Sequence, residues 1–181
     1  MGTSPDILRT KRLELVPMTL EMVEAVMSGR RADAERLVSA HMPGRWPNPE
    51  LVERAFTASL DSIRSEPLSC LWGNRVMIAQ PEGGQRFVVG SVVFHGAPGR
   101  EGIAEIAYGV EEGSQGRGYA SEAVDACVSW ALAQERVRAV QAATFAWHQP
   151  SLRVLAKVGM MPIGSRDHET MGEMLVFERR R

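Results

Sequence analysis

The stretch Ser-Gln-Gly-Arg-Gly-Tyr-Ala at residues 114–120 lies between a strand-like run at 103–110 and an amphipathic helical pattern. A strand, a glycine-rich turn and a helix together direct several backbone N–H groups and a helix N-terminus at one point, an arrangement that binds phosphate. Gly116 and Gly118 lack side chains, so a diphosphate can approach the main chain, and they tolerate the positive φ that such turns require. We therefore expect a phosphorylated cofactor at this turn.

Two common glycine-rich motifs do not fit this turn. A P-loop has a Lys-Ser or Lys-Thr pair after its last glycine, whereas Tyr119 and Ala120 follow Gly118. A Rossmann fingerprint needs three glycines at fixed spacing early in a βαβ unit, and that spacing is absent too. The pattern that remains is Gln115-x-x-Gly118-x-Ala120, with Gly116 and Arg117 inside it.

Length and composition indicate one soluble globular domain spanning residues 1–181, with 44% hydrophobic and 24% charged residues. A domain of this size needs no disulfides, so Cys70 and Cys127 are expected to be reduced core thiols. The net charge of −1 argues against nucleic acid or an anionic membrane as partner. No apolar run approaches the length of a membrane span, and a cytoplasmic location is expected. The three arginines at 179–181 are interpreted as a solvated tail.

Hydrophobic periodicity predicts a mixed α/β domain with helices first and most of the sheet later. A strand at 12–18 precedes a helix capped by Thr19, whose apolar face is expected to include Leu20, Val23 and Met27. Asn48-Pro49 predicts the start of another helix, which extends to Ile63. The remaining predicted segments are a helix at 32–41, strands at 75–79, 86–94 and 103–110, a helix from 118 to about 136, a strand at 137–145, a helix at 150–158, a polar loop at 164–172 and a strand at 174–177.

In this context the Gln-x-x-Gly-x-Ala pattern resembles the pyrophosphate-binding motif of the GNAT acetyltransferase superfamily. The resemblance covers nearly the whole chain and looks closest to the ribosomal-protein N-terminal alanine acetyltransferases. It also depends on three other patterns: Arg-x-x-Arg-Leu-x-Leu at 9–15, Glu-Ile-x-Tyr at 105–108, and Pro-Ser-x-Arg-Val-Leu-x-Lys-x-Gly at 150–159. It implies a single α/β (α+β) domain with a mixed, mostly antiparallel twisted sheet, a splayed central strand pair and flanking helices.

The same resemblance implies an N-acetyltransferase that uses acetyl-CoA and no metal, and it makes a homodimer plausible. Backbone amides of the turn would hold the CoA diphosphate, namely those of Gln115, Gly116, Arg117, Gly118, Tyr119 and Ala120, with Arg117 as a charge partner. The main chain of 108–110, including Tyr108, would run along pantetheine, and an amide near Val110 would bind the thioester carbonyl. Ser151 would protonate the leaving thiolate, and Lys157 would lie near the CoA phosphates.

His148 stands where the family usually has an asparagine that contacts pantetheine. A histidine can also donate a hydrogen bond or exchange a proton near neutral pH, so a cofactor contact is one interpretation. A helix-capping or surface role is the other. Tyr119 is interpreted as a packing residue rather than the catalytic acid.

Glu105 is the candidate general base, and alternation along its strand sets it on the face opposite Tyr108. A lone glutamate in a strand is also often simply solvent-facing. An α-amine with a pKa near 8 needs little base strength, whereas a lysine amine near 10.4 costs about 4–5 kcal/mol to deprotonate at neutral pH, so an α-amine is mildly favoured. A water relay, or a pKa raised by burial, would ease either case.

Several residues are candidates for the acceptor pocket, each with a structural alternative. Trp46 and Trp147 either wall the pocket or pack elsewhere, and three acids either attract a cationic acceptor or are solvated loop residues: Asp167, Glu169 and Glu173. The acceptor itself, a protein N-terminus or a small amine, is left open. So are two other functions: a non-catalytic acyl-CoA sensor, and a transferase for a longer acyl group.

Overall fold

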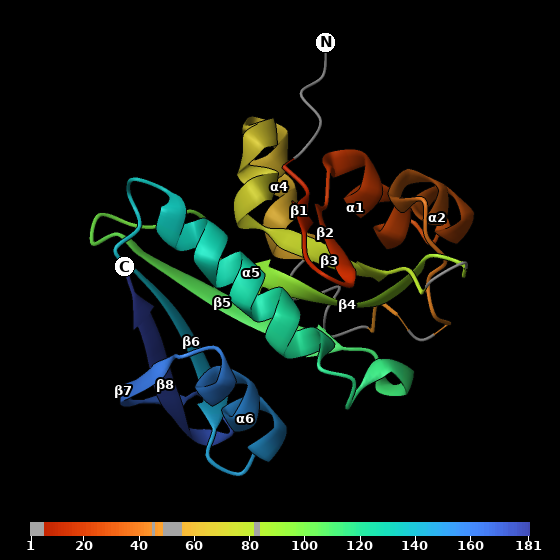
Figure 1. Cartoon of the computed structure of the whole chain (residues 1–181). Helices are drawn as coiled ribbons and strands as arrows, with labels where there is room; N and C mark the ends of the chain where they lie inside the picture. Colours follow the sequence, from red (N-terminus) through yellow and green to blue (C-terminus); the bar gives the residue numbers. More distant parts are fainter. Residues whose placement is uncertain (1–5, 45, 49–55, 82–83) are drawn as a thin grey trace.

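The computed structural model describes residues 6–44, 46–48, 56–81 and 84–181. Within these residues, eight strands form one sheet in the order β1-β2-β3-β4-β5-β6-β8-β7 (Figure 1). Neighbouring strands are antiparallel except β5 and β6, which are parallel. The expected mixed, mostly antiparallel sheet is confirmed. None of the described helices is long and apolar enough to cross a membrane.

The first half of the chain is an antiparallel meander with helices on one face. Its strands are β1 (Leu8–Arg9), β2 (Leu13–Pro17), β3 (Asn74–Ala79) and β4 (Phe87–Phe94). Its helices are α1 (Leu20–Met27), α2 (Arg31–Val38), α4 (Ala58–Ser65) and the 3-10 helix η2 (Pro67–Trp72). Because side chains alternate along a strand, Val76 and Ile78 of β3 pack in the core with α1 and α2, while Met77 and Ala79 face the other core.

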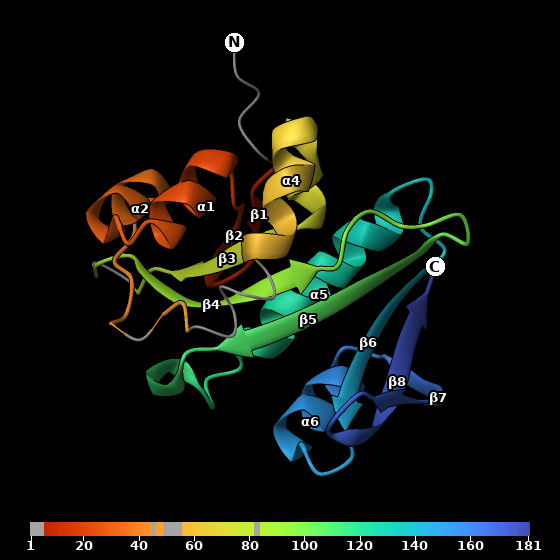
Figure 2. The same cartoon turned by 180° about the vertical axis from the view of Figure 1, so that it is seen from behind.

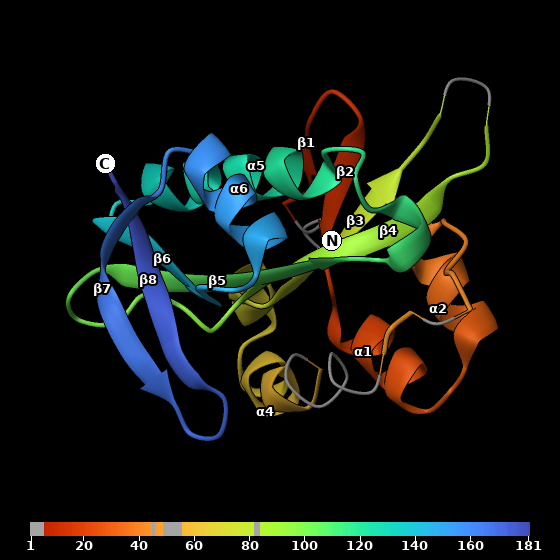
Figure 3. The same cartoon turned by 90° about the horizontal axis from the view of Figure 1, so that it is seen from below.

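The second half of the chain completes the sheet and covers its other face. The elements are β5 (Ile103–Val110), the 3-10 helix η3 (Glu112–Ser114), α5 (Tyr119–Ala133), β6 (Ala139–Phe145), α6 (Gln149–Lys157), β7 (Met161–His168) and β8 (Gly172–Arg180). Figure 3 shows α5 and α6 on one side of β5, with α1, α2 and α4 on the other. The face of α5 that carries Val124, Cys127 and Val128 is fully buried against the sheet.

The parallel pair β5 and β6 stays together for only a short distance. Ile103, Ala104 and Glu105 pair with Ala139, Val140 and Gln141, and the pairing then ends. Figure 2 shows the two strands diverging beyond this point, so that a gap opens between the remainder of β5 and β6. The predicted splay of the central strands is therefore present in this fold, and it leaves the β6-facing edge of β5 without a strand partner from residue 106 to 110 among the described residues.

Most predicted elements are present with boundaries shifted by a few residues. Thr19 caps α1 by accepting a hydrogen bond from the Met22 amide at 3.4 Å, as predicted. The predicted helix at 32–41 ends at Val38, because Ser39 adopts a left-handed φ of 51°. Cys70 and Cys127 are both buried free thiols, and burial raises the pKa of Cys127 to about 12. The helix start predicted at Asn48-Pro49 extends into residues outside those described.

Three predictions were wrong. The segment 164–172, expected to be a polar loop, largely forms β7, an exposed edge strand whose polar side chains gave no strand signal. The arginines at 179–181 are not a free tail: Arg179 and Arg180 belong to β8, and the Arg181 side chain donates to the Leu132 carbonyl at 3.0 Å. In α1, Met27 is 39% exposed at the helix end, whereas Met22 and Ala25 are buried beside Val23.

Candidate active site

The glycine-rich turn joins the free end of β5 to the N-terminus of α5. Gly116 and Gly118 have φ values of 73° and 82°, conformations that other residues rarely adopt, and Gly118 is the N-cap of α5. The Gln115 side-chain amide donates to the Val110 carbonyl at 3.1 Å, which ties the turn back to the strand. A residue with a side chain at 116 or 118 would strain this path, so the sequence pattern and the backbone geometry agree.

Arg12, the residue just before β2, makes side-chain contacts with the turn. Its Nη1 donates to the Arg117 carbonyl at 2.8 Å, and its Nε donates to Glu122 at 2.7 Å. Its guanidinium also lies over the Tyr119 ring at 4.9 Å from the centroid. Tyr119 thus packs beneath the Arg12 guanidinium. The same side chain holds the turn at the Arg117 carbonyl, although Arg12 lies more than a hundred positions earlier in the chain.

A cavity of about 670 Å³ opens beside this turn. Arg117 and Lys157, both exposed, line it together with Gly118. Two further cations that sequence reasoning had not assigned to a site, Arg12 and Arg179, also line it, but they are paired with Glu122 and Asp125. Arg117 and Lys157 make no ion pair among the described residues, so they are the cations available to a phosphate.

A pair of hydroxyls lies between β5 and α6. The Tyr108 hydroxyl is 2.8 Å from Ser151 Oγ and also donates to the Ser151 carbonyl at 3.3 Å. Ser151 is buried. Burial raises the pKa of Tyr108, and the hydrogen bond from Ser151 offsets this shift only in part. The side chain of Tyr108, for which only a main-chain role was predicted, therefore contacts the residue predicted to act on the thioester sulfur.

His148 is the N-cap residue of α6, but its imidazole makes no capping hydrogen bond. Its backbone carbonyl instead accepts hydrogen bonds from the amides of Ser151 and Leu152. The ring lies 3.4 Å from Thr144 Oγ1 through Nδ1. A side-chain capping role for His148 is thus excluded, while the ring itself lines the second cavity described next.

The second cavity, of about 620 Å³, runs along β5 and is lined by residues from both faces of the strand, Tyr108 among them. Its walls include His95, Glu105, Ala107 and Gly109. Both Glu105 carboxylate oxygens accept hydrogen bonds from Arg166 of β7, one of them at 3.2 Å from Nη1, and His95 Nδ1 is 3.7 Å away. Burial raises the pKa of Glu105, but the hydrogen bonds and charge of Arg166, together with His95, outweigh burial and lower it overall.

The remaining acceptor-pocket candidates are only partly brought together. Trp46 is buried and lines the 620 Å³ cavity, whereas Trp147 is 65% exposed and stacks on Phe145 outside it. Asp167, Glu169 and Glu173 do not line this cavity within the described part of the chain. Strand alternation in β7 presents Arg166 and His168 there instead, so the polar groups contributed by this hairpin are cationic or neutral rather than acidic.

The sequence did not identify Arg166, His168 and His95 as candidate site residues, because their segments carry no motif. The available signal for β7 was indirect: β8 needs an antiparallel neighbour, and the residues around Gly172 are typical of a hairpin turn.

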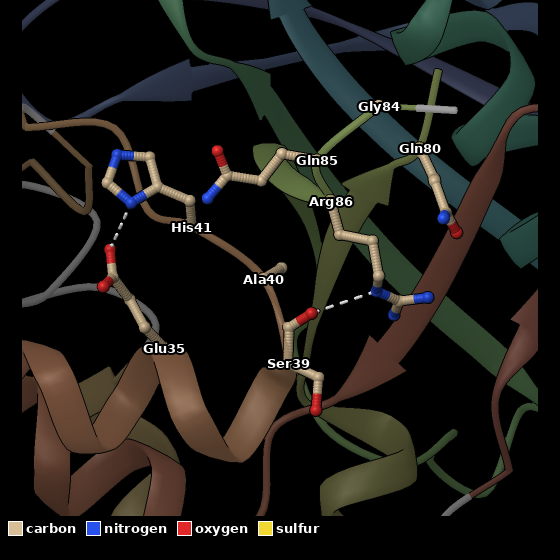
Figure 4. Close-up of a pocket in the computed structure, with 8 residues that line it drawn as sticks. All are labelled: Glu35, Ser39, Ala40, His41, Gln80, Gly84, Gln85 and Arg86. Carbon is tan, nitrogen blue, oxygen red and sulfur yellow. Dashed lines mark hydrogen bonds and ion pairs between the residues drawn. The ribbon is translucent and has the colours of Figure 1, made fainter. Parts of the chain in front are cut away.

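A third pocket, of about 430 Å³, lies at the end of α2 (Figure 4) and shares no lining residue with the other two cavities. Its ionisable groups are largely satisfied by the protein itself. Glu35 Oε1 lies 2.9 Å from His41 Nδ1 and accepts from the Met42 amide at 2.8 Å, and Arg86 donates to the Ser39 carbonyl at 3.0 Å. This pocket is therefore separate from the site formed by β5, the turn and α6.

The fold and this site define the class of protein. A model of the acetyltransferase (GNAT) domain matches residues 12–161. The chain therefore belongs to the GNAT acetyltransferase family, and it is an acetyltransferase. A curated relative, the uncharacterized N-acetyltransferase YjdG of Bacillus subtilis (strain 168), is 25% identical over 157 residues, which are 86% of this chain and 89% of the relative.

Solved structures share the whole fold at low identity. RimL, an alpha-N-protein acetyltransferase of a ribosomal protein, in complex with coenzyme A, has a TM-score of 0.67 at 15% identity, with 97% of this chain and 98% of that one covered. A GNAT-family acetyltransferase from Bacillus anthracis has a TM-score of 0.62 at 20% identity, with coverage of 97% and 98%. The self-immunity acetyltransferase MccE, in complex with acetyl-CoA and AMP, has a TM-score of 0.65 at 12% identity, with coverage of 95% and 94%. The likeness to the ribosomal-protein branch is confirmed at the level of fold.

Proposed function

We propose that this protein transfers the acetyl group of acetyl-CoA to a primary amine by direct attack in a ternary complex. The observation that carries this proposal is the free edge of β5, which extends from the end of its pairing with β6 to the glycine-rich turn. An extended ligand can lie along such an edge as an additional strand, with its diphosphate at the turn. The GNAT domain and the solved complexes of RimL with CoA and of MccE with acetyl-CoA support the choice of cofactor.

The residues around the turn fit a diphosphate. Nothing lies within 4 Å of the position that a Cβ would take at Gly116, so the turn leaves room for a ligand. The amides of 115–120 would hold the diphosphate, with Arg117 and Lys157 as cations in the adjoining cavity. On the free edge itself, the Val110 amide would donate to the thioester carbonyl, whose oxygen gains charge during attack. Loss of one such donor typically costs about 3–4 kcal/mol.

The Tyr108 and Ser151 hydroxyls would together supply the proton that the leaving thiolate needs. A thiol has a pKa near 8.5 and a tyrosine near 10, a value that burial raises for Tyr108, whereas a serine hydroxyl is a far weaker acid still. Ser151 alone is thus a poor proton donor, but it can pass a proton from Tyr108, whose hydroxyl is 2.8 Å away. We assign Ser151 the contact with sulfur and Tyr108 the role of proton source behind it.

Glu105 would receive the proton from the attacking amine, directly or through water. Its pKa is lowered and both of its oxygens are held by Arg166, so it is a weak base. A weak base is sufficient for an amine that is already partly neutral at pH 7, as an α-amine with a pKa near 8 is. This favours an α-amine acceptor over a lysine side chain, as does the alpha-N-protein activity named for RimL.

The test is release of free CoA thiol from acetyl-CoA in the presence of an amine panel: amino-acid amides, free amino acids, short peptides with free N-termini, polyamines and blocked lysine. Turnover is expected with α-amines, with loss in Ser151→Ala. CoA binding without turnover of any amine would instead favour the sensor. Propionyl-CoA and succinyl-CoA serve as matched donors, and a clear preference for either would replace acetyl as the transferred group.

A further inference from the structure

Gly109, in β5, is a glycine that neither its φ nor its immediate neighbours require. Its φ lies outside the left-handed region, and nothing lies within 4 Å of the position that a Cβ would take. At Gly90 of the neighbouring strand, by contrast, packing leaves no room for a side chain, because a Cβ there would lie 2.2 Å from the Gly109 carbonyl oxygen. A glycine within a strand weakens it and often marks the close approach of a ligand. Neither backbone conformation nor packing accounts for Gly109, and the open space beside it is what a closely approaching ligand would need.

The empty space beside Gly109 belongs to the 620 Å³ cavity, which Gly109 lines together with Ala107. Both residues are exposed on this face of β5, so the floor of the cavity has no large side chain at these two positions. The other walls include the apolar residues Val93, Ala143 and Met174. Gly109 lies between Tyr108 and Val110, the residues assigned to the thioester, so the space adjoins the point of attack.

Trp46 supplies a second, independent observation in the same cavity. Its side chain is 5% exposed and packs edge-on to Phe56 with the ring centroids 6.2 Å apart. Its indole Nε1 is buried and has no hydrogen-bond partner among the described residues. A buried donor without a partner costs about 1–3 kcal/mol, and such groups are rare unless a ligand or water satisfies them.

We propose that Gly109 and Trp46 select the acceptor: an α-amine whose adjacent carbon carries a large apolar side chain and a carbonyl or carboxylate group. The side chain occupies the space above Gly109, and a rotation of the Trp46 indole toward the cavity lets the oxygen accept a hydrogen bond from its Nε1. This chemistry is shared by a free amino acid and by the first residue of a peptide. The inference rests on the proposed acetyl transfer and names its acceptor class.

The first experiment replaces the missing side chain. With acetyl-CoA as donor, kcat/KM is measured for phenylalaninamide, leucinamide and glycinamide. The wild-type protein is expected to prefer the two large amides, and Gly109→Leu is expected to lower the ratio of kcat/KM for phenylalaninamide to that for glycinamide at least tenfold, with Gly109→Ala in between. Gly99→Leu is the matched control, because Gly99 also has an ordinary φ and nothing within 4 Å of its Cβ position, but it lies in a loop outside the cavity.

The second experiment removes only the indole N–H. Trp46→Phe is compared with wild type on phenylalaninamide and on 2-phenylethylamine, which lacks the carbonyl. Trp46→Phe is expected to lower the ratio of kcat/KM for phenylalaninamide to that for 2-phenylethylamine about fivefold or more. The two amines differ in pKa, but this difference is the same for both proteins and cancels when their ratios are compared. Assays of free phenylalanine and of a peptide with N-terminal phenylalanine then show which source of the α-amine is preferred.

Failure of the acceptor assignment and failure of the proposed acetyl transfer, on which the assignment rests, would give different results. If no amine on the panel is acetylated, the proposed transfer fails. If amines are acetylated but Gly109→Leu leaves the ratio of large to small acceptors unchanged, or Trp46→Phe affects both phenyl substrates equally, the acceptor assignment is wrong and the transferase remains. Melting temperatures of all variants confirm that the folded protein is being compared.

Discussion

At the scale of single residues, the two hydroxyls of Tyr108 and Ser151 carry the most chemistry. Tyr108→Phe removes the hydroxyl while the ring stays packed, and we expect kcat to fall by about 10- to 100-fold, because proton transfer by a positioned side chain contributes at least this much. The KM for acetyl-CoA should change little, since the cofactor is held mainly by main-chain groups. Steady-state kinetics of thiol release measure both parameters.

The control for this prediction is the combination with Ser151→Ala. If Tyr108 acts through Ser151, the double variant should be no slower than Ser151→Ala alone, because residues that act as a unit have non-additive effects. Strictly additive losses would mean that the two hydroxyls work independently, and the relay would be rejected.

The ion pair between Glu105 and Arg166 should make the stability of the folded protein depend on pH. The pKa of Glu105 lies below its ordinary value of 4.5 in the folded protein, so folding favours the ionised carboxylate. The stability that it contributes is present above pH 4.5 and is lost as pH falls through the folded-state pKa. Because Arg166 is about half exposed, Glu105→Gln should lower the free energy of unfolding by only about 0.5–1 kcal/mol at pH 7.

Urea denaturation of wild type and Glu105→Gln at pH 7 and at pH 4 measures this difference. The gap between the two proteins should narrow at the lower pH. Arg166→Met should show a similar loss at pH 7, and the double variant should lose no more than the larger single loss. A gap that stays constant with pH would show that the carboxylate charge does not contribute through this pair.

At the scale of elements, the glycine turn and α5 form one unit whose geometry depends on Gly118. Placing a side chain at φ 82° costs about 1–2 kcal/mol, and the new Cβ would lie 3.3 Å from Arg12 Nη2, the guanidinium that also holds the turn. We therefore expect Gly118→Ala to weaken CoA binding about tenfold or more and to lower the melting temperature slightly. Isothermal titration calorimetry with CoA and thermal denaturation measure the two effects.

Gly99→Ala is the matched control, because Gly99 has an ordinary φ and nothing near its Cβ position. It should leave both values close to wild type. If Gly118→Ala lowered stability but bound CoA normally, the turn would be required for folding alone, and its amides would not hold the diphosphate.

Individual elements also show which parts of the fold and of the site the sequence could predict and which it could not. The run from β5 through the turn into α5 was predictable because strand alternation, glycine punctuation and helical spacing are all local and agree with one another. The edge strand β7 was not, because it is exposed and carries Gly164, Ser165, Arg166 and Asp167 where a buried strand would show apolar residues. The contact of Arg166 with Glu105 spans 61 positions and two elements, and no local pattern encodes it.

At the scale of the whole molecule, the sheet consists of two parts that meet along a short seam. Only three residue pairs join β5 to β6, while α5 packs against β5, β6 and α6. A ligand that lies along the free edge of β5 and contacts α6 through Ser151 would add connections between the two parts. Ligand binding should therefore stabilise the folded protein as a unit, beyond local ordering of the turn.

The resulting prediction is a rise in melting temperature with CoA. A ligand at about 100 times its Kd adds about 2.7 kcal/mol to the free energy of unfolding. For a domain of 181 residues this corresponds to a rise of about 5–10 °C, which differential scanning calorimetry measures directly. Pantetheine, which lacks the diphosphate, should raise it less at the same concentration, and Arg117→Ala combined with Lys157→Ala should reduce the shift given by CoA but not the one given by pantetheine. Equal shifts from both ligands would mean that the turn does not bind the diphosphate, because its contribution separates the two.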